Sequence, residues 1–162
     1  MLGMGDDTLT ESVWDYPRPP AVQACGCRVR IELGGLTIVD STAALRVLET
    51  SHPPTIYVPP ADIAPGSVEA GAGRSFCEWK GIADYLDIVA GGRREARAAW
   101  TYRDPVHAYA ALRDHVAFYP SRMDACRLDD ELVQSQAGDF YGGWITAALR
   151  GPFKGAPGTS GW

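Results

Sequence analysis

The alternation of apolar and polar residues along the chain is typical of short β-strands. Residues 29–33 (VRIEL) place three apolar side chains on one face of a strand and two charged side chains on the other. Residues 36–40 (LTIVD) form a second apolar run, and Gly34 and Gly35 between the runs accept the positive φ angles of a two-residue turn. The pattern therefore predicts a β-hairpin over residues 29–40.

Further short strands are predicted along most of the remaining chain. They are expected over residues 55–58, 76–85, 98–102, 116–119, 123–128 and 131–133, with a Gly-Gly turn within residues 86–96. Residues 41–50 fit either a helical turn or a strand, and residues 61–74, rich in glycine and alanine, fit a loop. Asp104 as N-cap and Pro105 at the first helical position predict one short helix that runs into residues 106–115.

Composition indicates one globular domain. The chain has 162 residues, of which 46% are hydrophobic and 22% charged, and this is enough apolar material for a core. Its 18 glycines and 12 prolines favour turns and short strands over long helices. We expect a flexible N-terminal arm (1–12), a β-rich domain (13–136) and a C-terminal strap (137–162) that packs on the domain.

The charge of the chain bears on its partners and location. The net charge is −5 and no dense Lys/Arg patch occurs, which argues against nucleic-acid binding. The first ten residues lack the basic start and apolar run of a signal peptide, and no apolar stretch approaches the roughly 20 residues that span a bilayer. We expect a cytoplasmic protein with no membrane partner. The oligomeric state does not follow from the sequence.

Four cysteines raise the question of a metal or of disulfides. In a cytosolic chain, Cys25, Cys27, Cys77 and Cys126 are expected to be reduced. Their spacing is one C-x-C pair followed by two isolated residues, whereas a structural zinc site usually offers two C-x₂₋₄-C pairs. We therefore expect no zinc and no other cofactor.

Residues 76–85 (FCEWKGIADY) carry the densest mixture of chemical groups. Read as one strand, they place Cys77 and Trp79 on one face and Glu78 and Lys80 on the other. Glu78 and Lys80 fit either an exposed ion pair or a site in which Lys80 is a positive anchor or a base. A nucleophilic thiol requires a nearby cation or imidazole, and none adjoins Cys77 in the sequence.

A carboxylate and several rings complete the set of candidates. Glu49 and His52 lie three residues apart and fit either an acid–base pair or a glutamate beside a simple loop histidine. Aromatic residues are frequent on the predicted strands and at their edges: Tyr57, Trp79, Tyr85, Trp100, Tyr119, Tyr141 and Trp144. Some of these rings belong to a core, and the others can line a cavity for a planar or cationic ligand. Phosphate-loop, Rossmann, H-E-x-x-H and G-x-S-x-G motifs are absent from the sequence.

An ordered series of motifs resembles a known family. The runs VRIELGGLTIVDS, RVLETSHPPTIYVPPADI, CEWKGIADY, AAWTYRDP and VAFYPSRMD, over about residues 28–126, look like the family named domain of unknown function 427 (DUF427). Its members are similar in a glycine-containing first hairpin, a glutamate after the second apolar run, a Tyr-Pro strand and a Cys-x-x-Lys-Gly stretch. These features fall on Gly35, Asp40, Glu49, Tyr57, Pro59, Cys77, Lys80, Gly81, Tyr85, Trp100, Tyr102, Pro105, Phe118 and Tyr119.

The resemblance implies a fold but no settled activity. It implies a β-tent-like fold of several coiled antiparallel sheets, similar to methionine sulfoxide reductase B and the cereblon ligand-binding domain. Those relatives usually hold zinc through paired C-x-x-C knuckles, which this chain lacks. A proline–aromatic pair usual between the family's cysteine and lysine is Glu78-Trp79 here, and a frequent tryptophan is Leu86. The family's label hints at nucleotidyl transfer, for which the sequence carries no motif.

These observations lead to three functional hypotheses. The first is binding or conversion of a small molecule in an aromatic pocket. Its catalytic candidates are Glu49, His52, Cys77 and Lys80, and its ligand-binding candidates are Tyr57, Trp79, Tyr85, Trp100 and Tyr119. The second is a non-catalytic binding module, and the third is a structural or protein-interaction domain in which the Cys-x-x-Lys-Gly stretch serves only the fold.

Overall fold

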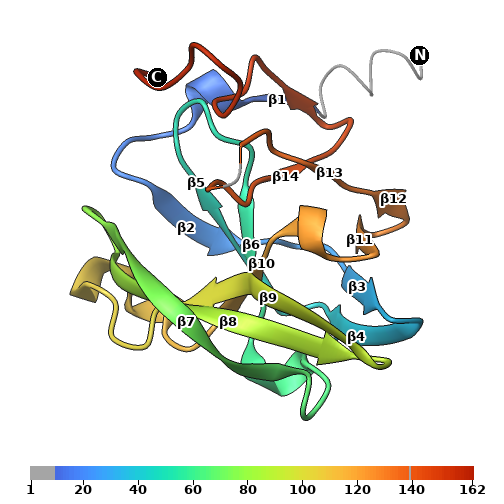
Figure 1. Ribbon diagram of the computed structural model, residues 1–162. Helices are drawn as coiled ribbons and strands as arrows, with labels where there is room; N and C mark the ends of the chain where they lie inside the picture. Colours follow the sequence, from blue (N-terminus) through green and yellow to red (C-terminus); the bar gives the residue numbers. More distant parts are fainter. Residues whose placement is uncertain (1–9, 139) are drawn as a thin grey trace.

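Strands are the main regular structure of the molecule (Figure 1). A computed structural model describes residues 10–138 and 140–162. Its strands are β1 (Glu11–Ser12), β2 (Ala21–Ala24), β3 (Val29–Leu33), β4 (Leu36–Ser41), β5 (Leu45–Leu48), β6 (Thr55–Tyr57), β7 (Val68–Cys77), β8 (Gly81–Ala90), β9 (Arg93–Thr101), β10 (Val116–Phe118), β11 (Ala125–Leu128), β12 (Glu131–Leu132), β13 (Gln134–Ser135), β14 (Trp144–Ile145) and β15 (Leu149–Arg150). The only helices in the described part of the chain are 3₁₀ turns, at Val13–Asp15, Pro60–Asp62, His107–Leu112 and Pro120–Arg122.

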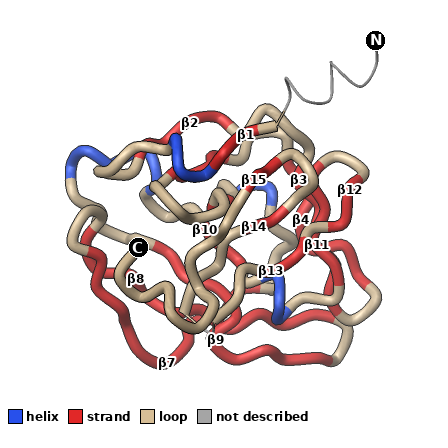
Figure 2. Tube along the Cα trace, turned by 90° about the horizontal axis from the view of Figure 1, so that it is seen from above, coloured by secondary structure: helices blue, strands red, loops and turns tan. Residues whose placement is uncertain are grey.

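The strands form several small sheets (Figure 2). Two antiparallel sheets have four strands each, in the orders β10-β9-β8-β7 and β12-β11-β3-β4. A third sheet has the order β2-β5-β6, and β13 pairs with β14. The expectation of a mainly β domain built from short antiparallel sheets is therefore confirmed.

The main core lies where these sheets meet. The alternation in β3 buries Val29, Ile31 and Leu33, which confirms the hairpin predicted over residues 29–40. These side chains pack in one cluster with Ile88 of β8 and Phe118 of β10. Burial of such a cluster is the main force that holds the sheets together.

Two turns touch where the sheets approach each other. Gly34, in the β3–β4 turn, and Gly91, in the β8–β9 turn, both have positive φ. A Cβ atom at Gly34 would overlap the carbonyl oxygen of Ala90, and one at Gly91 would overlap that of Gly34. Only glycine therefore allows the two backbones to approach so closely.

Two predicted elements differ in the structure. Of the two alternatives left open for residues 41–50, the structure has the strand, β5. The expected loop over residues 61–74 is half strand, because β7 begins at Val68. A register shift between Ala70 and Arg74 accommodates the Gly-rich stretch as a bulge, which is why its composition resembled that of a loop. The expected short helix after Pro105 is a kinked 3₁₀ helix, and Asp104 does not cap it, because the N-cap is Val106.

The reading of residues 76–85 as one strand is wrong. Cys77 ends β7, Gly81 begins β8, and the three residues between them form a tight turn. The backbone N–H of Val106 donates to the carbonyl oxygen of Lys80 over 2.9 Å and holds this turn against the following loop. Lys80 consequently does not lie on the opposite face from Cys77.

The expectation of four reduced cysteines is also wrong for one pair. Cys25 and Cys27 form a disulfide, whereas Cys77 and Cys126 are free. Tertiary structure brings Cys126 into the core and Cys77 to a pocket edge, so neither lies beside that pair.

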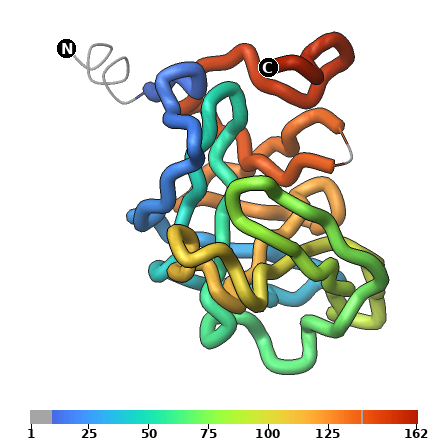
Figure 3. The backbone as a smooth tube through the Cα atoms, turned by 90° about the vertical axis from the view of Figure 1, so that its left-hand side faces the viewer, coloured from blue at the N-terminus to red at the C-terminus, as the bar shows by residue number. Residues whose placement is uncertain are grey.

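The two ends of the described chain lie side by side (Figure 3). Residues 1–9 of the expected N-terminal arm lie outside the described residues, and Glu11 and Ser12 pair in parallel with β15. The C-terminal segment packs on the domain: Trp144 is buried in the main core, and Phe153 packs against a smaller cluster around Val13. Within the described residues no helix has the length and apolar character to cross a membrane. The cytoplasmic location stays a prediction.

Candidate functional site

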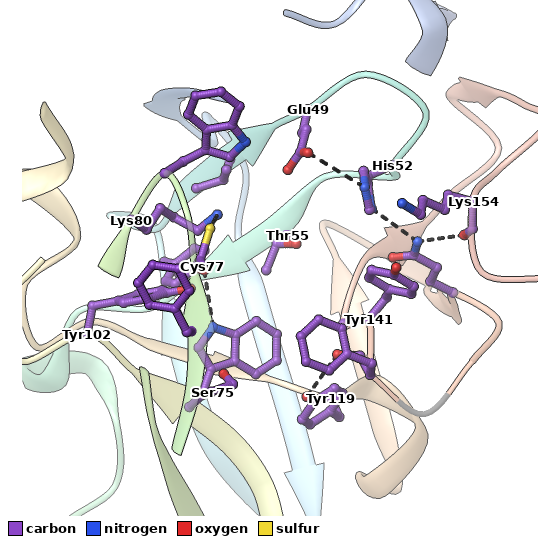
Figure 4. Close-up of a pocket in the computed structure, with 18 of the residues that line it drawn as sticks. Glu49, His52, Thr55, Ser75, Cys77, Lys80, Tyr102, Tyr119, Tyr141 and Lys154 are labelled. Atoms are coloured by element: carbon purple, nitrogen blue, oxygen red, sulfur yellow. Dashed lines mark hydrogen bonds and ion pairs between the residues drawn. The ribbon is translucent and has the colours of Figure 1, made fainter. Parts of the chain in front are cut away.

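A pocket of about 490 Å³ opens between β5–β6, the β7–β9 strands and the C-terminal segment (Figure 4). Small-molecule sites typically measure roughly 300–1,000 Å³, so this pocket has the size of a ligand site. All nine candidate residues chosen from the sequence line it: Glu49, His52, Tyr57, Cys77, Trp79, Lys80, Tyr85, Trp100 and Tyr119. Residues from four separate stretches of the chain, 49–57, 77–85, Trp100 and Tyr119, are thus brought to one cavity.

Glu49 and His52 are held together by a local turn. The backbone N–H of His52 donates to the carbonyl oxygen of Glu49 over 3.0 Å, and Ser51 between them has a φ of 74°. This left-handed residue closes the turn and points both side chains toward the pocket, with Glu49 Oε2 3.9 Å from His52 Nε2. Arg18 Nε lies 3.4 Å from the same carboxylate oxygen.

Gln136 fixes the tautomer of His52. The backbone N–H of Gly143 donates to Gln136 Oε1 over 3.1 Å, so the amide nitrogen of Gln136 points away from Gly143. That nitrogen donates to the carbonyl oxygen of Lys154 over 2.6 Å and faces His52 Nδ1 at 3.4 Å. Because an amide nitrogen only donates, Nδ1 accepts, and the proton of neutral His52 sits on Nε2, toward Glu49.

The charge state of His52 follows from its surroundings. Its pKa is lowered to about 4, first by burial and then by the positive charges of Lys154, Arg18 and Lys80. The Glu49–His52 contact is therefore not an ion pair at neutral pH. Both ring nitrogens of His52 are already directed at partners, so Glu49 is the better placed proton acceptor of the two.

Lys80 and Cys77 form the second polar pair of the pocket. Lys80 Nζ donates a hydrogen bond to Cys77 Sγ over 3.3 Å, and it lies 6.0 Å from the centre of the Tyr102 ring. The cation beside Cys77 is therefore Lys80, which lies three residues further along the chain and across the β7–β8 turn. Figure 4 places this pair opposite Glu49 and His52, with Thr55 between them.

Aromatic rings form the wall of the pocket. Trp100 is in contact with Tyr57 and Tyr119, with ring centres 6.2 Å and 4.7 Å apart. Trp100 Nε1 donates to the Tyr57 hydroxyl over 3.2 Å, and the Tyr119 hydroxyl donates to the carbonyl oxygen of Phe140 over 3.0 Å. Such edge-on and tilted contacts hold the rings in fixed positions. Trp144, by contrast, is a core residue.

Burial sets the ionisation of the tyrosines. It raises the pKa of Tyr57, Tyr102 and Tyr119 well above the usual range for a phenol. These hydroxyl groups are therefore protonated at neutral pH and act as neutral hydrogen-bonding groups.

Several pocket residues were not selected from the sequence: Gln136, Phe140, Gly142 and Lys154. Together with Tyr141, one of the aromatic residues noted from the sequence, they come from the end of the chain and close one side of the pocket. The backbone N–H of Lys154 donates to the carbonyl oxygen of Ser51 over 2.8 Å, which anchors this segment beside the Glu49–His52 turn. No local pattern marks these residues, because their role depends on where the strap crosses the domain.

The fold and the pocket define a mainly β domain with an aromatic, ligand-sized cavity. The chain belongs to the family described as Domain of unknown function (DUF427), whose model matches residues 21–129, as the sequence motifs indicated. A search of curated proteins finds no match. The pocket residues contributed by the C-terminal segment lie outside the matched region. Among residues 10–138 and 140–162, no group of three or more His, Cys, Asp or Glu side chains is placed to hold a metal ion.

Proposed function

We propose that this protein binds a small molecule in the aromatic pocket. The observation that carries the proposal is the convergence of the aromatic wall with two polar pairs, Glu49–His52 and Cys77–Lys80, on one cavity of about 490 Å³. Small-molecule sites typically combine rings, which hold a flat group of the ligand, with a few polar groups, which orient the ligand.

A paired tryptophan substitution tests the proposal. Trp100 contributes to the pocket wall, whereas Trp14 meets Trp162 edge-on, with ring centres 5.1 Å apart, and is not a pocket residue. Native mass spectrometry of the purified protein, followed by a thermal-shift screen of small aromatic compounds, identifies ligands of the wild type. We expect Trp100→Leu to lose these ligands and Trp14→Leu to keep them.

A second, milder variant tests the proposal in case Trp100→Leu does not fold. Thr55 lies in the middle of the pocket, and Thr55→Val removes its hydroxyl group with little change in shape. Ligands that bind Trp100→Leu and Thr55→Val as tightly as the wild type would contradict the proposal. So would a wild type that binds none of the compounds.

Conversion of the ligand is the second candidate function. It is favoured by the arrangement in which a thiol hydrogen-bonded to an ammonium group faces a carboxylate across the pocket. Under this hypothesis Glu49→Gln, which keeps the shape of the side chain, retains the ligand and abolishes turnover. In a pure binding module the same substitution leaves the fate of the ligand unchanged.

A further inference from the structure

Lys80 is a buried cation without an anionic partner. Its residue is only 8% exposed, and among the described residues no carboxylate lies within ion-pairing distance of its Nζ. Its one hydrogen bond goes to the sulfur of Cys77. An ammonium group has three donors, so two are left without a hydrogen-bond partner among the described residues. Burial of a charge without a partner is costly, which makes an anion from outside the protein favourable here.

A second ammonium group lies across the same pocket. Lys154 Nζ donates to the main-chain oxygen of Trp162 over 3.5 Å and lies 5.6 Å from the centre of the Tyr141 ring, and none of the described Asp or Glu side chains forms an ion pair with it. The acidic groups of the pocket do not compensate these charges. Glu49 is paired with Arg18. Glu78 also lines the pocket, but its side chain is exposed and, among the described residues, it forms no ion pair with either lysine.

The electrostatic effect on His52 agrees with this count of charges. After burial, the largest causes that lower its pKa are the positive charges of Lys154, Arg18 and Lys80. The charges that act most strongly on His52 are therefore positive, although the whole chain carries a net charge of −5. A buried cation without an acidic partner favours anions over neutral molecules of the same shape.

We propose that the ligand is a flat organic anion whose carboxylate or phosphate group ion-pairs with Lys80 while its ring lies on the Trp100 wall. This inference rests on the proposed small-molecule function and narrows it to one class of ligand. Lys154 is placed to contact the same anionic group or a second one. Cys77 then has a positioning role, because its sulfur holds the ammonium group of Lys80 in place.

Matched acid and amide probes test the inference. The probes are indole-3-acetate, indole-3-acetamide and phenyl phosphate, titrated into ¹⁵N-labelled full-length protein and followed by the shifts of pocket amides. We expect the acid to bind at least about tenfold more tightly than the amide. Added salt should weaken the binding of the acid and leave the binding of the amide unchanged. The comparison of carboxylate with phosphate shows which anion the site prefers.

Two variants separate the role of Lys80 from overall charge. Lys80→Met keeps the length of the side chain and removes the charge, and Arg74→Gln removes a charge from an exposed ion pair with Asp84 on the same hairpin. We expect Lys80→Met to abolish the preference for the acid and Arg74→Gln to retain it. The free Lys80→Met protein should melt at the same temperature as the wild type or higher, because an uncompensated buried charge is removed.

The outcomes distinguish this inference from the function on which it rests. Equal affinity of the wild type for acid and amide overturns the anionic ligand and leaves pocket binding intact. A preference for the acid that survives in Lys80→Met, or a clear loss of stability in the free variant, overturns the role of Lys80. If no probe shifts any pocket amide at millimolar concentration, both proposals fall.

Discussion

The ammonium group of Lys80 donates a hydrogen bond to the sulfur of Cys77 across the turn between β7 and β8, over 3.3 Å. This contact places the Cys77 thiol at the edge of the pocket, where solutes can reach it. Cys126, the other free cysteine, is only 2% exposed and lies in the main core. The two free thiols therefore have opposite accessibility.

Alkylation of the native protein should modify Cys77 alone. Burial raises the pKa of Cys126 to about 12, so its thiol is protonated as well as covered at neutral pH. Iodoacetamide should add a single group per chain to the folded protein. A second group should be added after unfolding and two more after reduction of the Cys25–Cys27 disulfide. Intact-mass measurement with peptide mapping counts the groups and locates them.

A Cys77→Ser variant is the control for this experiment. It should take up no label while folded. Rapid labelling of Cys126 in the native state, or four modified cysteines without any reductant, would contradict the described structure.

Gly142→Ala should disturb the pocket with a limited effect on the core. A Cβ atom at this position would overlap the Trp100 indole and come within 3.5 Å of the Tyr119 ring. Displacement of the indole should shift the tryptophan fluorescence and lower the free energy of unfolding by about 1–3 kcal/mol. Urea unfolding followed by fluorescence measures both quantities. Gly161→Ala is the matched control, since no atom lies within 4 Å of its Cβ position, and it should behave like the wild type.

Two neighbouring glycines should differ sharply in their tolerance of alanine. Gly34 and Gly35 both have positive φ, so alanine at either position costs about 1 kcal/mol in backbone strain. Only at Gly34 would the added Cβ also strike the backbone of Ala90. We expect Gly34→Ala to lose about 3 kcal/mol or more of the free energy of unfolding and Gly35→Ala about 1 kcal/mol. Equal losses in urea denaturation would mean that the two turns do not touch.

His52 should make the protein sensitive to mild acid. Its pKa is about 4 in the folded state, against 6.5 in the unfolded chain, so between these values the unfolded chain binds more protons. The free energy of unfolding therefore rises with pH through this window and falls as the pH drops below about 6.5. From pH 7.5 to pH 4.5 this effect amounts to about 2 kcal/mol.

His52→Gln removes this group and keeps a polar side chain of similar length. Its free energy of unfolding should fall less between pH 7.5 and pH 4.5 than that of the wild type, as measured by urea denaturation at both values. Parallel curves for the two proteins would show that His52 is not buried in its neutral form.

Local pattern was sufficient for the framework of the molecule. The hairpin over residues 29–40 and the Gly-Gly turn before β9 were predicted because their signals, alternation and positive-φ glycines, lie within a few residues. The reversal at Lys80 was missed because residues 76–85 contain no Gly or Pro pair at the turn, and mixed polarity there resembles a two-faced strand. The short helix after Pro105 was predicted, but its N-cap is Val106 and not Asp104, because tertiary contacts override short-range propensity.

The sequence by itself determined the class of fold, the family and the residue types of the pocket, because these depend on periodicity and motifs carried by the chain. Only the tertiary structure decided which residues share the cavity. It joined Lys80 to Cys77, placed Gln136 beside His52 and brought Lys154 opposite Lys80 from the far end of the chain. The contacts of Gln136 and Lys154 are set by the packing of sheets and strap, and their sequence separation leaves no local signal. The Lys80–Cys77 contact is local, but it depends on a turn that the sequence pattern does not mark.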